Sequence, residues 1–194
     1  MKRVLLSGLF GGVVLFAWLS LAHVVLPLGE AGISEIPNEA SLLESMKTSL
    51  PKDGFYFFPG FGLQEGATAQ QQKEAMPQWE AKYRSGPHGI LIYHASGDNP
   101  MTAAQLVTEF LTNVAQALLA MLLLFWARIL SFARRFFFVA VTGVVAAIST
   151  NVSYWNWYGF PTSYTLAAII NMAVGFLFVA MVGAWMMKPA ASPA

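Results

Sequence analysis

The chain has 194 residues, of which 56% are hydrophobic and only 11% charged, and its mean hydropathy is +0.55. A soluble domain carries about 25% charged residues, so this composition is typical of a membrane protein. The absence of cysteine excludes disulfides, thiolate catalysis and cysteine-ligated metal or iron–sulfur centres. The net charge is +1 and no basic patch is interleaved with aromatic residues, so we expect no nucleic-acid partner.

The charges are unevenly distributed along the chain. All ten acidic residues lie between Glu30 and Glu109. Lysine and arginine gather on the cytoplasmic flanks of membrane helices, so the basic residues outside that window predict the orientation. We expect both termini and the link 127–135 to be cytoplasmic, and residues 29–102 to lie on the external or periplasmic side of a bacterial inner membrane. The basic residues concerned are Lys2, Arg3, Arg128, Arg134, Arg135 and Lys188.

The first predicted element is a membrane-spanning helix over residues 1–28. Its apolar run is longer than the 7 to 15 residues of a signal-peptide core, and no convincing small-residue cleavage site follows it. We therefore expect an uncleaved helix. Gly8 and Gly12 have the small-xxx-small spacing that lets helix backbones approach closely. We interpret them as packing positions within the protein's own bundle and not as a homodimer seam.

Residues 29–102 are predicted to form a small α/β cap outside the membrane. Helical spacing follows Asn38, an aromatic strand ends at Phe58, a polar helix covers residues 68–84, and a second strand ends at Tyr93. Pro77 is expected to break the polar helix into two short pieces. About 70 residues without a disulfide make a small core, so we expect the cap to dock on the bundle. His88 and His94 flank the second strand, but they form a weak metal pair and we predict no metal.

Three more membrane-spanning helices are predicted over residues 103–126, 136–154 and 164–187. Each is close to the 17 to 25 residues that cross the hydrocarbon core of a bilayer. A cytoplasmic turn (127–135) joins the first two, and a cytoplasmic tail (188–194) ends the chain. The outer turn 155–163, with residue 154 before it, is aromatic, which suits the lipid headgroup region: Tyr154, Trp155, Trp157 and Tyr158. The predicted fold class is thus an all-α, four-transmembrane-helix bundle, with the cap between helices 1 and 2.

Two stretches resemble a known group of proteins. The string from Tyr154 to Pro161 is similar to one in a group of uncharacterised bacterial four-helix integral membrane proteins with a WNWxGFP-type turn. The segment from Pro37 to Glu39, followed by Gly54 to Gly60, is similar to another part of the same group. The resemblance would cover most of the chain. It implies the four-helix architecture and carries no known activity.

The second helix carries a polar stripe that is a candidate site. Gln105, Glu109, Asn113 and Gln116 share one helical face, which we expect to line the bundle interior or a wet cavity. His23 near the end of the first helix is expected at a similar depth to Glu109, so the two could pair. Such a pair could relay protons, hold a metal with a third ligand, bind a polar headgroup, or only fix helix register. Asn171 is expected to hydrogen-bond to a neighbouring helix.

No catalytic motif is present in the sequence. There is no phosphate-binding loop, dinucleotide fingerprint, zinc-protease signature or nucleophile elbow, and we predict neither catalytic residues nor a cofactor. We expect a non-enzymatic accessory or scaffold subunit, with the lipid bilayer and other membrane-protein subunits as partners. The alternative is a protein that binds or transports a small molecule, lipid or ion through an outward-facing polar pocket between the first two helices.

Overall fold

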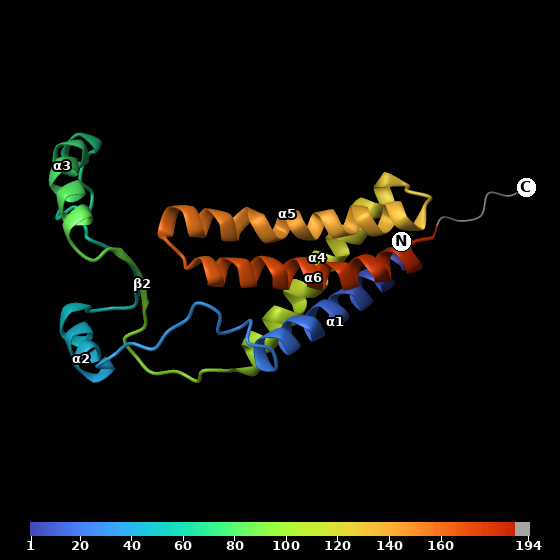
Figure 1. The fold of residues 1–194 in the computed structure, drawn as a ribbon, viewed down its shortest axis with the longest axis horizontal. Helices are drawn as coiled ribbons and strands as arrows, with labels where there is room; N and C mark the ends of the chain where they lie inside the picture. The colour runs from blue at the N-terminus through green and yellow to red at the C-terminus, as the bar shows by residue number, and fades with distance from the viewer. Residues whose placement is uncertain (189–194) are drawn as a thin grey trace, which may run out of the picture. The chain divides into compact units, whose positions relative to one another are not determined.

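The computed structural model describes residues 1–188, and the predicted tail falls outside this range except for Lys188. The chain forms two units, one built from Met1–Ile33 and the chain from Asn99 onward, the other from Ser34–Asp98. The elements, drawn in Figure 1, are α1 (Lys2–Val24), α2 (Glu39–Ser49), β1 (Gly54–Phe58), α3 (Ala69–Ser85), β2 (Gly89–Tyr93), α4 (Ala103–Ala127), α5 (Phe132–Tyr158) and α6 (Thr162–Met186).

Four of these helices, α1, α4, α5 and α6, are long and apolar enough to cross a membrane. They contain 23, 25, 27 and 25 residues. At about 1.5 Å per residue even α1 is roughly 34 Å long, more than the ~30 Å hydrocarbon core of a bilayer. The structure thus has four helices that are long and apolar enough to span a membrane, as predicted. It also has the small sheet, of two strands. The particular membrane, the orientation and the side of the cap remain predictions.

The bounds of the third apolar helix differ most from the prediction. α5 is four residues longer at each end than the expected 136–154, so the predicted outer turn 155–163 was wrong in extent. Hydropathy marks only the apolar centre of a helix, whereas arginine and aromatic residues also continue a helical turn. The reversal before α6 is only residues 159–161, where Gly159 takes a left-handed φ of 70°. α1 is shorter than expected and ends at Val24.

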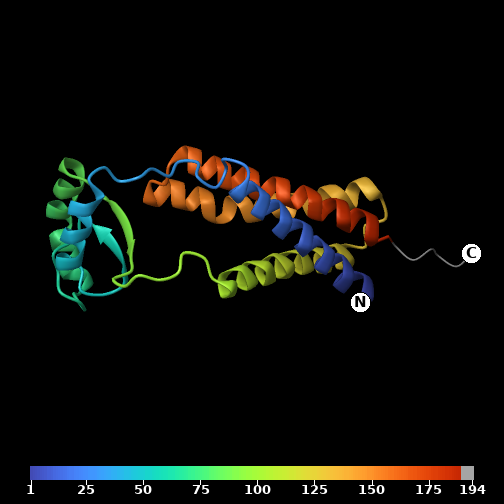
Figure 2. The same cartoon turned by 90° about the horizontal axis from the view of Figure 1, so that it is seen from below.

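The four-helix unit is assembled from helix pairs. α5 and α6 run antiparallel side by side, and α1 packs against both α4 and α6, whereas α4 touches α5 at only a few positions (Figure 1). In both views α4 and α5 converge at the link that joins them and diverge away from it (Figure 2). The buried core is small and aliphatic for the most part; it includes Leu15, Ala117, Met121, Val139, Phe176 and Val179.

Glycines bring α1 into backbone contact with α4. A Cβ atom at Gly8 would lie 2.8 Å from the Cα of Leu118, and one at Gly12 would lie 2.4 Å from the Cα of Val114. Both distances are shorter than atoms tolerate, so a larger residue would push the helices apart. The contacts also fix the register, because Gly12 is level with Val114. The rings of Phe16 and Phe110, 5.5 Å apart, continue the same register one turn further on.

The smaller unit contains a two-stranded antiparallel sheet that aromatic side chains pack against. β1 pairs with β2 from Gly54 opposite Tyr93 to Phe58 opposite Gly89. Phe57 of β1 stacks on Trp79 and Tyr83 of α3, with ring centres 6.4 and 6.5 Å apart. The Trp79 indole N–H also donates to the Pro59 carbonyl at 2.9 Å. No residue of this unit is fully buried, which agrees with the small core expected from its length.

The prediction that Pro77 breaks the polar helix was wrong. α3 is continuous from Ala69 to Ser85 with Pro77 inside it. Proline removes one backbone hydrogen-bond donor, but two features stabilise the helical turns on either side of Pro77. A capping box joins Thr68 and Gln71 at the start of the helix, and Trp79 and Tyr83 anchor the second half on the sheet.

An acidic side chain joins the two strands at one end of the sheet, where Gly54 pairs with Tyr93. Asp53 precedes β1 and accepts a 2.8 Å hydrogen bond from the backbone N–H of Ala95, which follows β2. The imidazole Nδ1 of His94 lies 3.5 Å from the same carboxylate. These interactions, the backbone hydrogen bond first, lower the pKa of Asp53 below its ordinary value of 3.8.

We predict that Gly12→Ala lowers the thermal stability of the detergent-solubilised protein. The clash with the Val114 backbone should cost about 1–3 kcal/mol, more than the ~1 kcal/mol that alanine gains in helix propensity. Gly97→Ala is the matched control, because a Cβ there meets open space. A melting temperature of Gly12→Ala equal to that of the wild type would show that α1 and α4 do not depend on this contact.

Candidate functional site

The structure splits the polar stripe of α4 into an exposed and a buried half. Gln105 and Glu109 are exposed, Asn113 is fully buried at 0% exposure, and Gln116 is half-buried. Of the two expected surroundings, the bundle interior therefore applies to Asn113 and in part to Gln116, but not to Gln105 and Glu109. The buried positions of α4 begin only at Asn113: none of its first ten residues is buried, and of these Phe110 contacts Phe16 of α1. Within the stripe, the Asn113 amide donates to a Glu109 carboxylate oxygen at 3.1 Å.

Gln105 caps the N-terminus of α4, and this uses its side-chain oxygen. Its side-chain oxygen accepts from the Thr102 backbone N–H at 2.7 Å, and the Thr102 hydroxyl oxygen accepts from the Gln105 N–H at 3.2 Å. This is a capping box, in which each residue satisfies a backbone donor of the other. The signal is present in the sequence as Thr102 followed three residues later by glutamine, but it was not used to predict this capping box.

His23 and Glu109 do not come together. The His23 ring is hydrogen-bonded to the Leu19 carbonyl at 3.2 Å, and within the described residues no hydrogen bond or ion pair joins it to Glu109. The register explains this, since Gly12 is level with Val114. His23 is eleven residues beyond that level and Glu109 only five. At about 1.5 Å per residue His23 is roughly 9 Å further along the unit, so the expected similar depth was wrong. Figure 2 shows the two helices separating toward this end.

Several buried oxygen atoms of the four-helix unit accept no hydrogen bond. Among residues 1–188, the structure shows no hydrogen bond from the Asn171 side chain to another helix; instead the Asn171 backbone carbonyl accepts from the Trp18 indole N–H at 2.9 Å. A buried unpaired oxygen costs about 1–3 kcal/mol, so each such atom is a candidate contact for water or a ligand. They are Asn113 Oδ1, Gln116 Oε1, Thr165 Oγ1 and Asn171 Oδ1.

The predicted aromatic turn residues lie on the last turn of α5. Trp155 donates from its indole N–H to the Thr162 hydroxyl at 3.1 Å, which fastens α5 to the start of α6. Tyr154 stacks on Phe160 and makes an edge contact with Tyr158. Trp157 is 76% exposed. This end of the helix pair is therefore both fastened and rich in exposed rings, as an interfacial anchor requires.

The opposite end of the unit depends on a buried arginine. Arg135 is only 4% exposed, and its guanidinium donates to the Ala184 carbonyl near the end of α6 at 3.1 and 2.9 Å. It also donates to the carbonyls of Ile129 and Leu130 in the link before α5. The side chain thus joins the C-terminal end of α6 to the link. A cation is favourable there, because the carbonyls at a helix C-terminus carry partial negative charge.

From the sequence, Arg135 was interpreted only as a basic residue that sets the orientation in the membrane. The signal for its burial is periodicity, since Arg135 is in line with the buried Val139, Gly143 and Ala147 at spacings of four residues. Arg134, its neighbour in the chain, is exposed because it falls on a different face of the same helix turn. Two adjacent arginines therefore have different roles.

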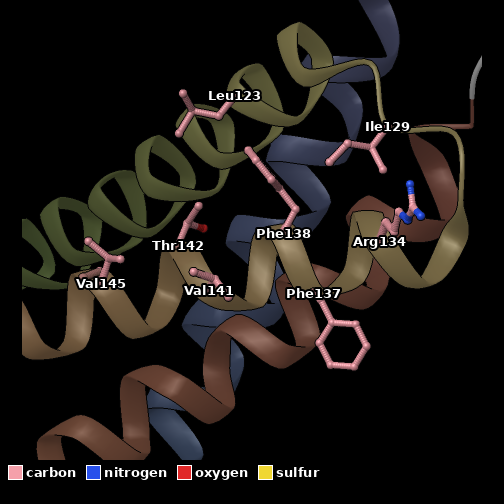
Figure 3. A pocket seen from close by; sticks show the side chains of 9 residues that line it. Leu123, Ile129, Arg134, Phe137, Phe138, Val141, Thr142 and Val145 are labelled. Atoms are coloured by element: carbon pink, nitrogen blue, oxygen red, sulfur yellow. The ribbon is translucent and has the colours of Figure 1, made fainter.

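Two hollows lie at this basic end of the four-helix unit. One is a groove of about 690 Å³ between α4 and α5, and Figure 3 shows Leu123 and Ile129 facing Phe138 across it, with Arg134 at its end. The other, of about 860 Å³, is lined by the start of α1 and the ends of α4 and α6. Its basic residues are Lys2, Arg3, Arg128 and Lys188, and Ile129 borders both hollows.

The described residues hold no group of three or more histidines or carboxylates able to bind a metal ion. His88 stacks on Tyr83 with ring centres 4.0 Å apart, while His94 is paired with Asp53. Each histidine of the smaller unit thus has a local contact of its own. Comparison with protein-family models, curated proteins and solved structures gives no match.

We predict that Arg135→Met lowers the stability of the protein by about 3 kcal/mol. The substitution removes hydrogen bonds from a charged donor, worth about 1.5–3 kcal/mol each, and leaves buried carbonyls unpaired. Thermal unfolding in detergent measures the loss. Arg134→Met is the matched control, because it removes the same charge from an exposed position and should change stability little. Equal melting temperatures for the two variants would contradict the bridging role of Arg135.

Proposed function

We propose that the chain is a multi-pass membrane protein that acts as a non-enzymatic accessory or scaffold subunit, and that the first half of α4 contacts a partner subunit. The observation that carries the proposal is the uncovered state of this half-helix. Leu106, Val107 and Leu111 are 47%, 56% and 58% exposed, and Glu109 is exposed among them. Lipid would suit the apolar side chains but not the carboxylate.

The depth of Glu109 is the reason for proposing a protein partner. It is six residues from the start of α4, about 9 Å along the helix, so its carboxylate would lie inside the edge of the hydrocarbon. Holding a charged side chain within a bilayer costs a few kcal/mol at the centre and less near the interface. One Glu109 oxygen accepts from Asn113. A partner helix with a hydroxyl, amide or basic side chain would supply further donors, at about 1–2 kcal/mol for each interhelical hydrogen bond.

The alternative, a protein that binds or transports a small molecule, lipid or ion, has one observation in its favour. The buried oxygens of Asn113 and Gln116 on α4, and of Thr165 and Asn171 on α6, are hard donors of the kind that suit water or a cation. The absence of a bond between His23 and Glu109 counts against the specific pocket expected between the first two helices.

The partner hypothesis predicts that Glu109→Gln releases a membrane protein that the wild type retains. The protein is purified from its native host in mild detergent, and co-purifying proteins are quantified by mass spectrometry. His23→Ala is the matched control, since His23 is an exposed polar residue toward the same end but lies on α1. Partner retention by Glu109→Gln, at unchanged stability, would contradict the contact. If both variants keep every partner but lose a bound ion or small molecule, the alternative is favoured.

The orientation proposed for the bacterial inner membrane rests on the bias of lysine and arginine. Both ends of the chain would be cytoplasmic and the smaller unit external. Because the chain has no cysteine, a single introduced cysteine can be labelled without background. We expect a membrane-impermeant maleimide to label Gly97→Cys in intact cells lacking an outer-membrane barrier, and Lys188→Cys only after lysis. The reverse pattern would overturn the orientation.

A further inference from the structure

The groove between α4 and α5 has an almost wholly apolar lining. Leu123 lines it from α4, and Phe138, Val141 and Val145 line it from α5 (Figure 3). Thr142 is the one uncharged polar residue of the lining, and its hydroxyl donates to the Val139 carbonyl of the same helix at 2.7 Å. The groove therefore offers nothing for a polar ligand to bond along its length. It suits a hydrocarbon chain.

One end of the groove carries a positive charge. Arg134 lies there on the first turn of α5, and in the part of the chain that the structure describes no carboxylate forms an ion pair with it. Arg135 beside it is already bonded to carbonyls. All acidic residues of the chain lie between Glu30 and Glu109, so the sequence places none on α5, α6 or the link. The basic residues of the second hollow add to this positive field across Ile129.

The length of the groove fits half a bilayer. From Arg134 to Ala146 there are twelve residues, about 18 Å along α5. Half of the ~30 Å hydrocarbon core is about 15 Å. A charge at one end and an apolar channel one leaflet deep are the features of an amphiphile lying parallel to the helices. The volume of about 690 Å³ is also within the ~300–1,000 Å³ of small-molecule sites.

We propose that this groove binds one acyl chain of an anionic phospholipid, with the lipid phosphate at the Arg134 guanidinium. The bound chain would fill the space that opens where α4 and α5 diverge from their link. The site presupposes the membrane location proposed above, which cysteine labelling tests independently. It is separate from the exposed half of α4, because its lining begins at Leu123, fourteen residues beyond Glu109.

The test is lipid retention measured by native mass spectrometry of the full-length protein in detergent, with phosphatidylglycerol and phosphatidylcholine of equal chain length. The wild type should retain phosphatidylglycerol preferentially. Arg134→Gln should reduce that preference about fivefold, while Arg134→Lys should keep most of it. Ala146→Trp places a ring in the groove and should abolish retention of either lipid.

Two matched controls separate the groove from general effects. Val144→Trp adds the same ring at an exposed position of α5 outside the lining, and Lys2→Gln removes a charge at the second hollow. Val144→Trp should retain lipid as the wild type does, and Lys2→Gln should lower the preference for phosphatidylglycerol far less than Arg134→Gln does. The proposal is overturned if Ala146→Trp binds as much lipid as Val144→Trp, or if Lys2→Gln reduces the preference as much as Arg134→Gln.

A second measurement uses the wild-type protein, so its result does not depend on whether a variant folds. Phosphatidylglycerol with a photoreactive group in its acyl chain should crosslink to peptides containing Leu123, Phe138 or Val141. Crosslinking only to other peptides would overturn the proposed site. If a helix of another protein is found to occupy the groove, the groove is a subunit contact and the lipid proposal is overturned. Glycerol phosphate, which has the headgroup charge but no chain, should fail to displace the lipid; displacement would make this a phosphate site and refute the chain-binding groove.

Discussion

At Gly12 of α1 a single added carbon would lie 2.4 Å from the Cα of Val114 on α4, so only glycine lets the two backbones meet there. Apolar helices in a lipid environment gain little from hiding apolar surface from one another, and close packing is what holds them together. The same device recurs elsewhere in the unit. A Cβ at Gly143 would meet the Phe176 side chain at 2.1 Å, and one at Gly175 would meet Leu15 at 2.5 Å.

This contact determines where the polar residues of α4 lie. The helices meet near Gly12 and separate beyond it, which leaves the first half of α4 outside the core. Asn113 falls on the buried side of that division and Glu109 on the exposed side, although a hydrogen bond joins them. The polar stripe, which is continuous in the sequence, is thus buried at Asn113 and exposed at Glu109 in the structure.

At the basic end of the unit, two consecutive arginines have different surroundings. The Arg135 guanidinium is enclosed among carbonyls of α6 and the link, and it closes the end of the bundle. The Arg134 guanidinium points to the end of an apolar groove. Their α-carbons are consecutive, but a rotation of about 100° per residue sends one side chain inward and the other outward. The charge bias that predicts topology does not distinguish them.

The sequence by itself determined the number of apolar helices, because a run of about twenty hydrophobic residues has few stable alternatives to a spanning helix. It also determined the strands ending at Phe58 and Tyr93, since aromatic and β-branched runs bounded by turn residues favour strands. It placed Asn38 at the start of α2, although no side-chain bond caps the helix there. Helix ends were less predictable, because a hydropathy profile does not detect helical turns that contain arginine or tryptophan, as at Arg135 and Trp157.

Only the tertiary structure decided which of these residues meet. His23 and Glu109 each occupy a plausible position on their own helix, but their separation follows from the register that Gly12 and Val114 impose. The groove beside Arg134 exists because α4 and α5 pack on different partners, α1 and α6, and therefore diverge. Register and divergence depend on contacts between residues on different helices, such as Gly12 with Val114 and Gly143 with Phe176, and no local pattern of hydropathy or charge records such contacts.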